Sequence, residues 1–272
     1  MSVVVLTGAG RGIGREIAVH LAQAGHRLGL TARTEVELEE TARLVSEIGA
    51  DAVAVAADVA SPADVDRLCA DVERRLGPVT GLVNCAGFYG DCEPFVASDP
   101  DLWWRVLETN LRGPMLLQRR LLPGMIAYGE GRVVNLSTRM AFDTEASVPF
   151  TAYGVSKGAL LRLSALLAAE LTGTGVSIFD LSPGLVRTAM SAQMTGSEDW
   201  PDEVWLPPSA VAEQVLALLS GGYDVLSGHF VHVRDDLDRL ATAVAQDLDR
   251  RTIVLTRTGS GDHLGEGRGL TL

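Results

Sequence analysis

Val3-Val4-Val5-Leu6 is followed directly by Thr7-Gly8-Ala9-Gly10-Arg11-Gly12-Ile13-Gly14 near the start of this chain. The first run is apolar and β-branched, which is typical of a buried parallel strand. After the glycines, Ile17, Leu21 and Ala24 recur at helical spacing. The stretch therefore predicts a strand, a tight glycine turn and a helix, in that order.

This order of elements suits the pyrophosphate of a dinucleotide. Glycines let the pyrophosphate approach the backbone, and the free N–H groups and dipole at the start of a helix favour an anion. A glycine-rich run is weak evidence alone and much stronger between a strand and a helix. The alternative is a purely structural turn.

Strand-like and helix-like segments alternate along most of the chain. The strand-like runs begin near Val3, Arg27, Ala52, Thr80, Arg132, Val176 and Gly228. The helix-like stretches cover roughly residues 12–24, 35–48, 62–76, 99–122, 152–172 and 209–220. Such alternation predicts an α/β fold with a Rossmann-type, doubly wound parallel sheet of seven strands and helices on both faces. Ligands are then expected beyond the carboxyl ends of the strands.

One catalytic domain is expected over residues 1–234, holding cofactor and substrate sites together. A C-terminal extension over residues 235–258 would combine a helix within Asp235–Arg251 with a strand at Thr252–Thr256. Its apolar helical stripe has three possible partners: the substrate entrance, a partner subunit or the chain's own core. Gly259–Leu272 is Gly-rich and polar, as in a flexible tail.

Composition narrows the function class. The 272 residues are 47% hydrophobic, enough to bury a substantial core, and the net charge of −12 argues against nucleic acid. No apolar run reaches the roughly 20 residues that span a bilayer, and no signal peptide is expected before Val3. Cys69, Cys85 and Cys92 lack metal-ligand spacing, so no metal is expected and a reducing cytoplasm is the expected location.

A second feature is the pair Tyr153 and Lys157 in Tyr153-Gly154-Val155-Ser156-Lys157. At i, i+4 the two side chains share a face of a helix. A phenol has a pKa of about 10, and a neighbouring ammonium lowers that pKa. The pair would then be a tyrosine general acid/base working near neutral pH. By itself such a pair is more often an ordinary exposed Tyr and Lys.

Together with further motifs, these segments resemble the short-chain dehydrogenase/reductase family, in its single-domain branch, from Val3 to about Val233. Thr7–Gly14 resembles the Thr-Gly-x-x-x-Gly-x-Gly motif. Asn84-Cys85-Ala86-Gly87 resembles Asn-Asn-Ala-Gly, with Cys85 in place of the second Asn. The Tyr153 and Lys157 pair matches Tyr-x-x-x-Lys.

Two more motifs follow the family order. Asn110, in Thr109-Asn110-Leu111-Arg112-Gly113, matches the catalytic Asn. Pro183-Gly184-Leu185-Val186-Arg187-Thr188 matches the Pro-Gly-x-Val-x-Thr stretch around the nicotinamide. Five motifs in the right order make the resemblance specific.

The resemblance implies a set of cofactor-binding residues. They are Gly8, Gly10, Arg11, Gly12, Ile13, Gly14, Ala32, Arg33, Asp58, Val59, Asn84, Ala86, Gly87, Tyr153, Lys157, Pro183, Gly184, Val186 and Thr188. Asp58 matches an adenine-contacting Asp, although it also fits the N-cap region of the next helix.

The catalytic set implied by the resemblance is Asn110, Tyr153, Lys157 and one hydroxyl. The family usually has two hydroxyl or small residues at the end of its fifth strand, the second being catalytic. Register places Thr138 there and Ser137 before it, and the spacing to Tyr153 is longer than usual by two residues. Thr donates the same hydrogen bond as Ser, so Thr138 is favoured and Ser137 is the alternative.

The choice of cofactor follows from charge. An acid after the second strand of a Rossmann unit accepts from the ribose 2′-OH and would repel a 2′-phosphate. Ala32 stands in that place, Arg33 follows it, and Arg11 lies in the glycine turn. Two guanidinium groups favour a 2′-phosphate, so NADP(H) is the expected cofactor.

The resemblance implies an NADP(H)-dependent oxidoreductase that reduces a ketone or aldehyde to an alcohol, or the reverse. Tyr153 would donate the proton to the developing alkoxide, and the Thr138 or Ser137 hydroxyl would bind the same oxygen. Lys157 would lower the pKa of Tyr153 and bind the ribose, while Asn110 would hold a water. The alternatives are a non-catalytic NADP(H)-binding sensor or scaffold subunit and, more narrowly, an epimerase or isomerase.

An apolar substrate pocket is expected from the residues around these motifs. They are Phe88, Tyr89, Met140, Phe142, Phe150, Met190, Met194, Trp200 and Trp205. The partner would be a small carbonyl or alcohol with an apolar part, unless these side chains only pack a lid onto the core. Trp103 and Trp104 lie on a helix that in the family helps form a dimer, so a homodimer or homotetramer is expected.

Overall fold

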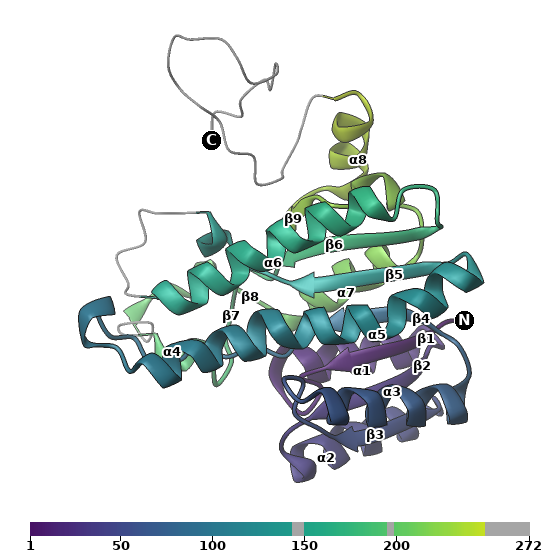
Figure 1. The fold of residues 1–272 in the computed structure, drawn as a ribbon, viewed down its shortest axis with the longest axis horizontal. Coiled ribbons are helices and arrows are strands. Elements are labelled where there is room, and N and C mark those ends of the chain that lie inside the picture. The colour runs from purple at the N-terminus through teal and green to yellow at the C-terminus, as the bar shows by residue number, and fades with distance from the viewer. Residues whose placement is uncertain (143–149, 195–198, 248–272) are drawn as a thin grey trace.

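The computed structural model describes residues 1–142, 150–194 and 199–247 of the chain. At its centre lies a sheet of seven parallel strands in the order β3-β2-β1-β4-β5-β6-β9 (Figure 1). The strands are β1 Val3–Thr7, β2 Arg27–Ala32, β3 Ala52–Ala56, β4 Val79–Asn84, β5 Gly131–Leu136, β6 Val176–Ser182 and β9 Phe230–His232. The expected doubly wound, Rossmann-type sheet is confirmed.

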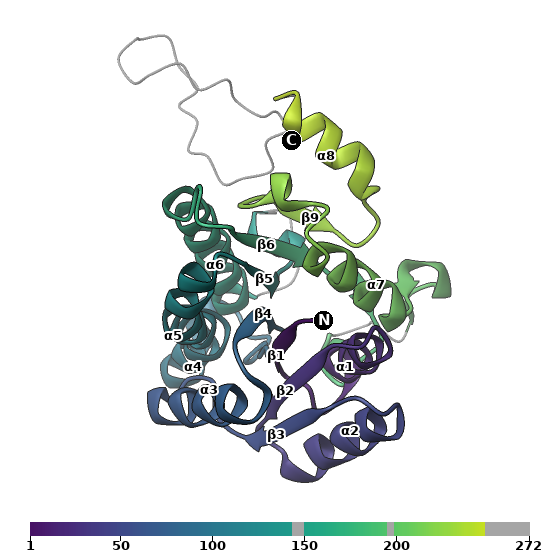
Figure 2. The same ribbon diagram turned by 90° about the vertical axis from the view of Figure 1, so that its right-hand side faces the viewer.

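Helices cover both faces of the sheet (Figure 2). One face carries α1 (Gly12–Gln23), α2 (Glu35–Glu47) and α7 (Pro208–Leu219). The other carries α3 (Pro62–Leu76), α5 (Gly113–Tyr128) and α6 (Thr151–Glu170). Two short strands, β7 (Leu185–Val186) and β8 (Trp205–Leu206), pair apart from the main sheet.

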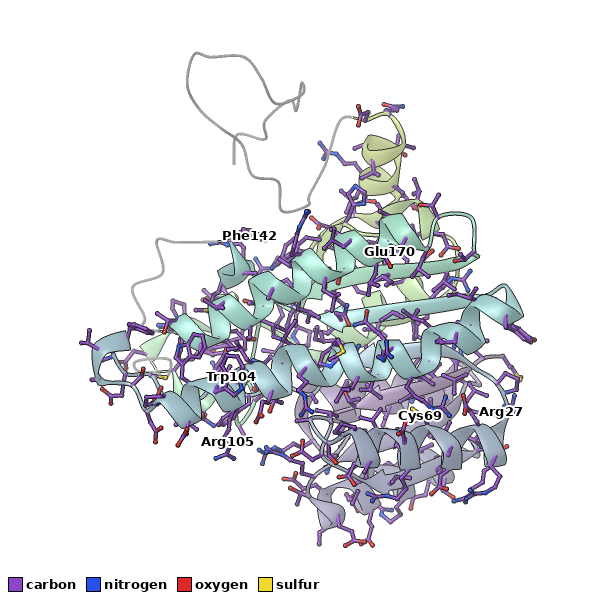
Figure 3. All side chains as sticks on the ribbon, in the orientation of Figure 1. Arg27, Cys69, Trp104, Arg105, Phe142 and Glu170 are labelled. Carbon is purple, nitrogen blue, oxygen red and sulfur yellow. The ribbon has the colours of Figure 1, made fainter. Side chains whose placement is uncertain are left out.

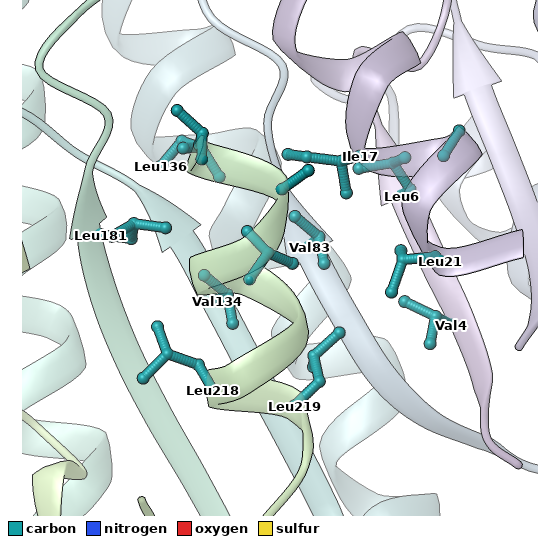
Figure 4. Close-up of a cluster of buried hydrophobic side chains, with 14 of the residues drawn as sticks. Val4, Leu6, Ile17, Leu21, Val83, Val134, Leu136, Leu181, Leu218 and Leu219 are labelled. Atoms are coloured by element: carbon teal, nitrogen blue, oxygen red, sulfur yellow. The ribbon is translucent and has the colours of Figure 1, made fainter. Parts of the chain in front are cut away.

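Each face of the sheet has its own apolar core, because successive side chains of a strand point to opposite faces. From β1, Val4 and Leu6 pack towards α1 and α7, where Figure 4 shows them near Ile17 and Leu21. Val3 and Val5 pack on the other side, towards α3 and α5. All five residues of β1 are therefore buried, as expected for a parallel strand covered on both faces.

The glycine turn between β1 and α1 is fixed by close backbone contacts. Gly8 and Gly12 have positive φ angles of 67° and 56°, which other residues rarely adopt. A Cβ atom on Gly14 would lie 2.0 Å from the carbonyl oxygen of Gly8. The hydroxyl of Thr7 accepts from the backbone N–H groups of Cys85 and Ala86, at 3.1 and 3.0 Å, and so joins this turn to the loop after β4.

The helix expected over residues 99–122 differs in the structure. It begins as α4 (Pro100–Leu107), passes through a π-helical turn at Glu108–Arg112, and continues as α5 to Tyr128. A π turn inserts an extra residue and rotates the following side chains, and such turns often occur at functional sites. Asn110 lies at the centre of this turn and is fully buried.

The C-terminal helix α8 (Leu237–Ala245) packs on the chain's own core. The carboxylate of Asp236 caps its start by accepting from the N–H of Arg239 at 3.0 Å. Leu237 and Leu240 join the core cluster that α1 and α7 share. The strand expected at Thr252–Thr256 and the tail expected at Gly259–Leu272 lie outside the described residues. Across the described ranges, no helix is both long and apolar enough to cross a membrane.

We expect Gly14→Ala to destabilise the protein strongly. The added methyl group would overlap the Gly8 carbonyl, and overpacking of this kind costs about 1–3 kcal/mol or more. Gly124→Ala is the matched control, since a Cβ there meets nothing within 4 Å in the described part of the chain, on an exposed turn of α5. That control should gain about 0.5–1 kcal/mol from helix propensity. Thermal unfolding of both variants measures the contrast, and equal melting temperatures would contradict it.

Candidate active site

A cavity of about 600 Å³ lies beyond the carboxyl ends of the central strands. Its lining includes most of the cofactor residues expected from the sequence: Gly8, Gly10, Arg11, Gly12, Ile13, Gly14, Ala32, Arg33, Asp58, Val59, Ala86, Gly87 and Thr188. Asn84, Tyr153, Lys157, Pro183, Gly184 and Val186 are not part of this lining. The lining also includes residues that sequence reasoning missed: Thr31, Thr34, Glu37, Ala57, Cys85, Thr109, Ala189 and Gln193.

The residues around the glycine turn fit a dinucleotide pyrophosphate. Among the residues that the structure describes, no side chain caps the start of α1, and the first turn of this helix has no acid. Its free N–H groups and positive dipole end therefore remain available to an anion at the cavity wall. A Cβ on Gly8 would come within 2.8 Å of the Ala86 nitrogen, and one on Gly12 within 3.4 Å of the Thr188 side chain. Only glycine keeps this cradle open.

Tyr153 and Lys157 lie on the first turns of α6, so the expected helical spacing of the pair is present. Both side chains are buried, at 7% and 4% exposure. The Lys157 Nζ donates to the carbonyl oxygen of Leu136 at 2.6 Å and lies 5.8 Å from the centre of the Tyr153 ring. The ammonium is thus fixed at the carboxyl end of β5, next to the phenol.

The pKa of Tyr153 moves in the direction opposite to the one expected from the sequence. Burial raises the pKa of Tyr153, and the neighbouring Tyr89 and Cys85 add to this effect. Burial also lowers the pKa of Lys157 to about 8, because the interior disfavours the charged ammonium. Desolvation therefore outweighs the ammonium that should lower the pKa of Tyr153. The phenol keeps its proton at neutral pH, as a proton donor requires.

An apolar, aromatic wall surrounds Tyr153. The Tyr89 ring meets the Tyr153 ring edge-on, with centroids 4.4 Å apart, and stacks on Phe150 at 5.1 Å. Phe150, Val106 and Met194 are buried in the same cluster. The partly buried members are Phe88, Tyr89, Cys92, Trp103, Leu107, Met140 and Trp200.

Two of the expected pocket residues have other partners. Phe142 packs edge-on against Phe230 of β9, with centroids 4.9 Å apart. Trp205 stacks on Trp200 at 5.7 Å, and the guanidinium of Arg187 lies 4.9 Å from the centre of the Trp205 ring. This aromatic pair therefore ties the segment after β7 to β8.

Asn110 joins three parts of the site. Its Nδ2 donates to the Phe88 carbonyl at 2.8 Å and to the Ser156 hydroxyl at 3.1 Å. Its Oδ1 accepts from the Phe88 N–H at 2.8 Å. The π turn thus fastens the loop after β4 to α6, one residue before Lys157.

The two candidate hydroxyls have different surroundings. Thr138 is half-buried, and its Oγ1 accepts from the Met140 N–H at 3.3 Å, which leaves its own proton available for donation. Ser137 is buried, and among the described residues its Oγ has no hydrogen-bond partner. Both follow β5 directly, and Thr138 is the more accessible of the two.

A buried polar row crosses three strands and was not expected from the sequence. Asn84 Nδ2 donates to Asn135 Oδ1 at 2.8 Å, Asn135 Nδ2 to Ser164 Oγ at 3.0 Å, and Ser164 Oγ to Asp180 Oδ1 at 3.0 Å. Burial raises the pKa of Asp180 to about 7, against the nearby charge of Lys157. Polar residues inside the apolar runs of β4, β5 and β6 were the available signal.

The end of the cavity next to β2 and α2 holds charges of both signs. Arg11 and Arg33 are exposed, as the sequence suggested, but Arg11 pairs with Glu37, an acid on the first turn of α2. Asp58 does not cap the next helix, because Ser61 does so by accepting from the Asp64 N–H at 3.3 Å.

The pKa of Lys157 makes stability depend on pH in a defined direction. Below about pH 8 the folded chain holds a buried ammonium, whereas the unfolded chain keeps this proton up to about pH 10.4. Between these values the unfolded state binds more protons, so this group's contribution to stability rises with pH.

We therefore expect the melting temperature of Lys157→Met, relative to wild type, to fall as the pH rises from 7 to 10. Met removes the ammonium while keeping an unbranched side chain of similar length. Without the ammonium the pKa of Asp180 rises further, which lowers the stability of the variant in the same direction as the pH rises. Paired thermal scans across this range give the difference at each pH. A difference that stayed constant with pH would show that Lys157 is not destabilised by burial.

A known protein family and several known proteins are similar to this chain. The family description "short chain dehydrogenase" matches residues 2–199. A short chain dehydrogenase of Pseudocercospora fijiensis is 38% identical over 190 residues, which cover 69% of this chain and 60% of that relative's length.

Two solved structures share the fold along most of their length. A variant of actinorhodin polyketide ketoreductase with NADPH has a TM-score of 0.79 at 31% identity, covering 85% of this chain and 95% of the other. NAD+-bound xylitol dehydrogenase has a TM-score of 0.78 at 25% identity, covering 85% and 96%.

The family match covers the glycine turn, Tyr153, Lys157 and the segment after β7. The order of the strands and the position of the cavity are those expected of this family. The chain therefore belongs to the short-chain dehydrogenase/reductase family of oxidoreductases, which bind a nicotinamide cofactor.

Proposed function

We propose that the protein is an NADP(H)-dependent reductase that converts a ketone or aldehyde to an alcohol, or catalyses the reverse reaction, with Tyr153 as general acid/base. The observation that carries this proposal is the buried Tyr153 beside a lysine fixed at the end of β5. The catalytic domain would span residues 1–234, with 235–258 as an extension and 259–272 as a tail. The free thiols of Cys69, Cys85 and Cys92 fit a cytoplasmic location.

The cofactor would lie along the cavity, with its pyrophosphate at the start of α1. Gly8, Gly12 and Gly14 would hold the pyrophosphate, and Thr188 would border the nicotinamide half. A bound nicotinamide supplies the hydride, which is chemistry that no side chain provides. Lys157 has two further N–H groups besides the one bonded to Leu136, and these suit ribose hydroxyls.

The protein's own groups would then handle the proton. Tyr153 holds a proton at neutral pH and would donate it to the oxygen as negative charge develops there. Thr138 would donate a second hydrogen bond to that oxygen, with Ser137 as the alternative. The Lys157 ammonium would stabilise the phenolate that remains, which is the state that burial alone disfavours. Asn110 would keep α6 in place relative to the loop after β4.

The substrate would be a small carbonyl compound with an apolar part. The wall of Tyr89, Phe150, Val106 and Met194 around Tyr153 supports this class, because it offers apolar surface next to the proton donor. The similarity to a polyketide ketoreductase agrees with ketone reduction. The structural relatives carry both NADPH and NAD+, so the preference for NADP(H) rests on Arg11 and Arg33.

A homodimer through α4 and α5 is part of the proposal. Trp103 packs against the apolar cluster around Tyr153, and its indole donates to the Thr151 hydroxyl at 3.1 Å. Trp104 is 59% exposed; Figure 3 labels its side chain on α4. Met115, Ile126 and Tyr128 of α5 are also exposed large apolar residues. Burying such side chains against a second copy would stabilise association.

Trp104→Glu should therefore make the protein monomeric or raise the dissociation constant of the homodimer at least tenfold. A buried, unpaired carboxylate opposes the contact that an indole favours. Analytical ultracentrifugation measures this, with Val36→Glu, at an exposed apolar position on α2, as the control. A wild-type monomer, or a Trp104→Glu dimer as tight as wild type, would refute this interface.

Tyr153→Phe tests the catalytic proposal. Loss of the proton donor should reduce turnover of a ketone by roughly 10²–10⁴-fold, while the dissociation constant for NADPH changes by only a few-fold. Tyr89→Phe is the control, since it keeps the ring that contacts Tyr153 and removes only a weak contact to the Met194 sulfur. NADPH oxidation against a panel of ketones and aldehydes, with binding by fluorescence, gives both numbers.

Near-normal turnover by Tyr153→Phe would rule out this residue as the general acid/base. Tight NADPH binding by the wild type without turnover of any carbonyl would favour a non-catalytic sensor or scaffold. Failure to bind either nicotinamide cofactor would overturn the site itself.

A further inference from the structure

Strand β2 ends without an acidic residue, but helix α2 places one, Glu37, at the same cavity. Ala32 ends β2, where Rossmann proteins that bind NAD carry an acidic residue. In the structure Glu37, on the first turn of α2, lines the same cavity. A Cβ on Gly10 would lie 3.1 Å from the Glu37 Cβ and 3.2 Å from the Ala32 Cβ. The side chain of Glu37 therefore leaves its helix beside the glycine turn and the end of β2.

The carboxylate of Glu37 contacts one of the two arginines on which NADP(H) binding would depend. Arg11 Nη1 lies 3.1 Å from Glu37 Oε1, with the two side chains 65% and 32% exposed. Ion pairs this exposed are weak, so Arg11 can exchange partners. The Glu37 carboxylate would nevertheless stay close to any phosphate that Arg11 binds.

The start of α2, which carries Glu37, is held by a partly buried set of hydrogen bonds from Arg15 and Thr41. Arg15 Nε donates to the Gly10 carbonyl and to the Thr41 hydroxyl, both at 3.1 Å, and Arg15 Nη2 donates to the Glu37 carbonyl at 3.3 Å. The Thr41 hydroxyl, fully buried, donates to the Ala9 carbonyl at 2.9 Å. These bonds join the first turns of α2 to the glycine turn and hold the backbone of Glu37 beside it.

We infer that Glu37 is a specificity-determining residue for the dinucleotide: it opposes the 2′-phosphate and favours an unphosphorylated ribose. A carboxylate repels phosphate and withdraws Arg11 from it, whereas it accepts from a ribose hydroxyl. Glu37 would therefore make the preference for NADP(H) weaker than Arg11 and Arg33 alone would make it. This inference rests on the proposed nicotinamide site and goes beyond it in assigning a role to Glu37.

The test is Glu37→Gln in the full chain, with dissociation constants for NADPH and NADH measured by tryptophan fluorescence or calorimetry. We expect the ratio of the NADH constant to the NADPH constant to rise at least tenfold, mainly through tighter NADPH binding. Glu40→Gln is the matched control: it removes the same charge from the same helix, but Glu40 pairs with Arg43 at 2.9 Å and does not line the cavity.

A ratio that stays within twofold of wild type in Glu37→Gln would overturn the inference, as would an equal rise in Glu40→Gln. The wild-type ratio separately tests the NADP(H) proposal. A wild type that prefers NADH, with a preference that Glu37→Gln reverses, would refute the proposed cofactor and support the role of Glu37. A wild type that prefers NADPH, with an unchanged ratio in Glu37→Gln, would support the proposed cofactor and refute the role of Glu37.

Discussion

The ammonium of Lys157 lies inside the protein, held by one short hydrogen bond to the last carbonyl of β5. Burying a charge is unfavourable, and the lowered pKa of Lys157 expresses this. The charge of Asp180, at the end of the buried row from Asn84 through Asn135 and Ser164, acts in the other direction and raises the pKa of Lys157. The hydrogen bonds of this row satisfy buried polar groups beneath α6, where an apolar core would offer them no partners.

The same burial determines what Tyr153 can do. A phenol surrounded by Tyr89, Phe150 and other apolar groups keeps its proton, because the phenolate would be poorly solvated there. A lysine one turn away does not overcome that effect, although it offers the compensating charge once the proton has left. The apolar surroundings keep the phenol neutral at rest, and the fixed ammonium can stabilise a negative charge that forms only during a reaction. The π turn at Asn110 and its bonds to Phe88 and Ser156 keep these groups in register.

At the other end of the cavity, the balance of charges rather than shape would distinguish NADP(H) from NAD(H). In the proposed site, Arg11 and Arg33 would attract a 2′-phosphate, and Glu37 would oppose it from a helix that Arg15 and Thr41 fasten to the glycine turn. On this proposal, a single acid in α2 would adjust the choice of cofactor without any change in β2. Because the pair is exposed, its influence should weaken with salt, unlike that of the buried groups around Lys157.

The sequence by itself determined the order of strands and helices, the glycine turn and the helical pairing of Tyr153 with Lys157. These features follow from local rules: strand and helix periodicity, the φ angles open to glycine, and side chains one turn apart. It also singled out Asn110, Thr138 and Arg11 through the family motifs, and their roles in the site stay predictions. The π turn, the raised pKa of Tyr153, the polar row and the pairing of Arg11 with Glu37 were decided only by the tertiary structure. Each depends on burial or on contacts between residues far apart along the chain, such as Asn84 with Asn135, and local periodicity carries no information about either.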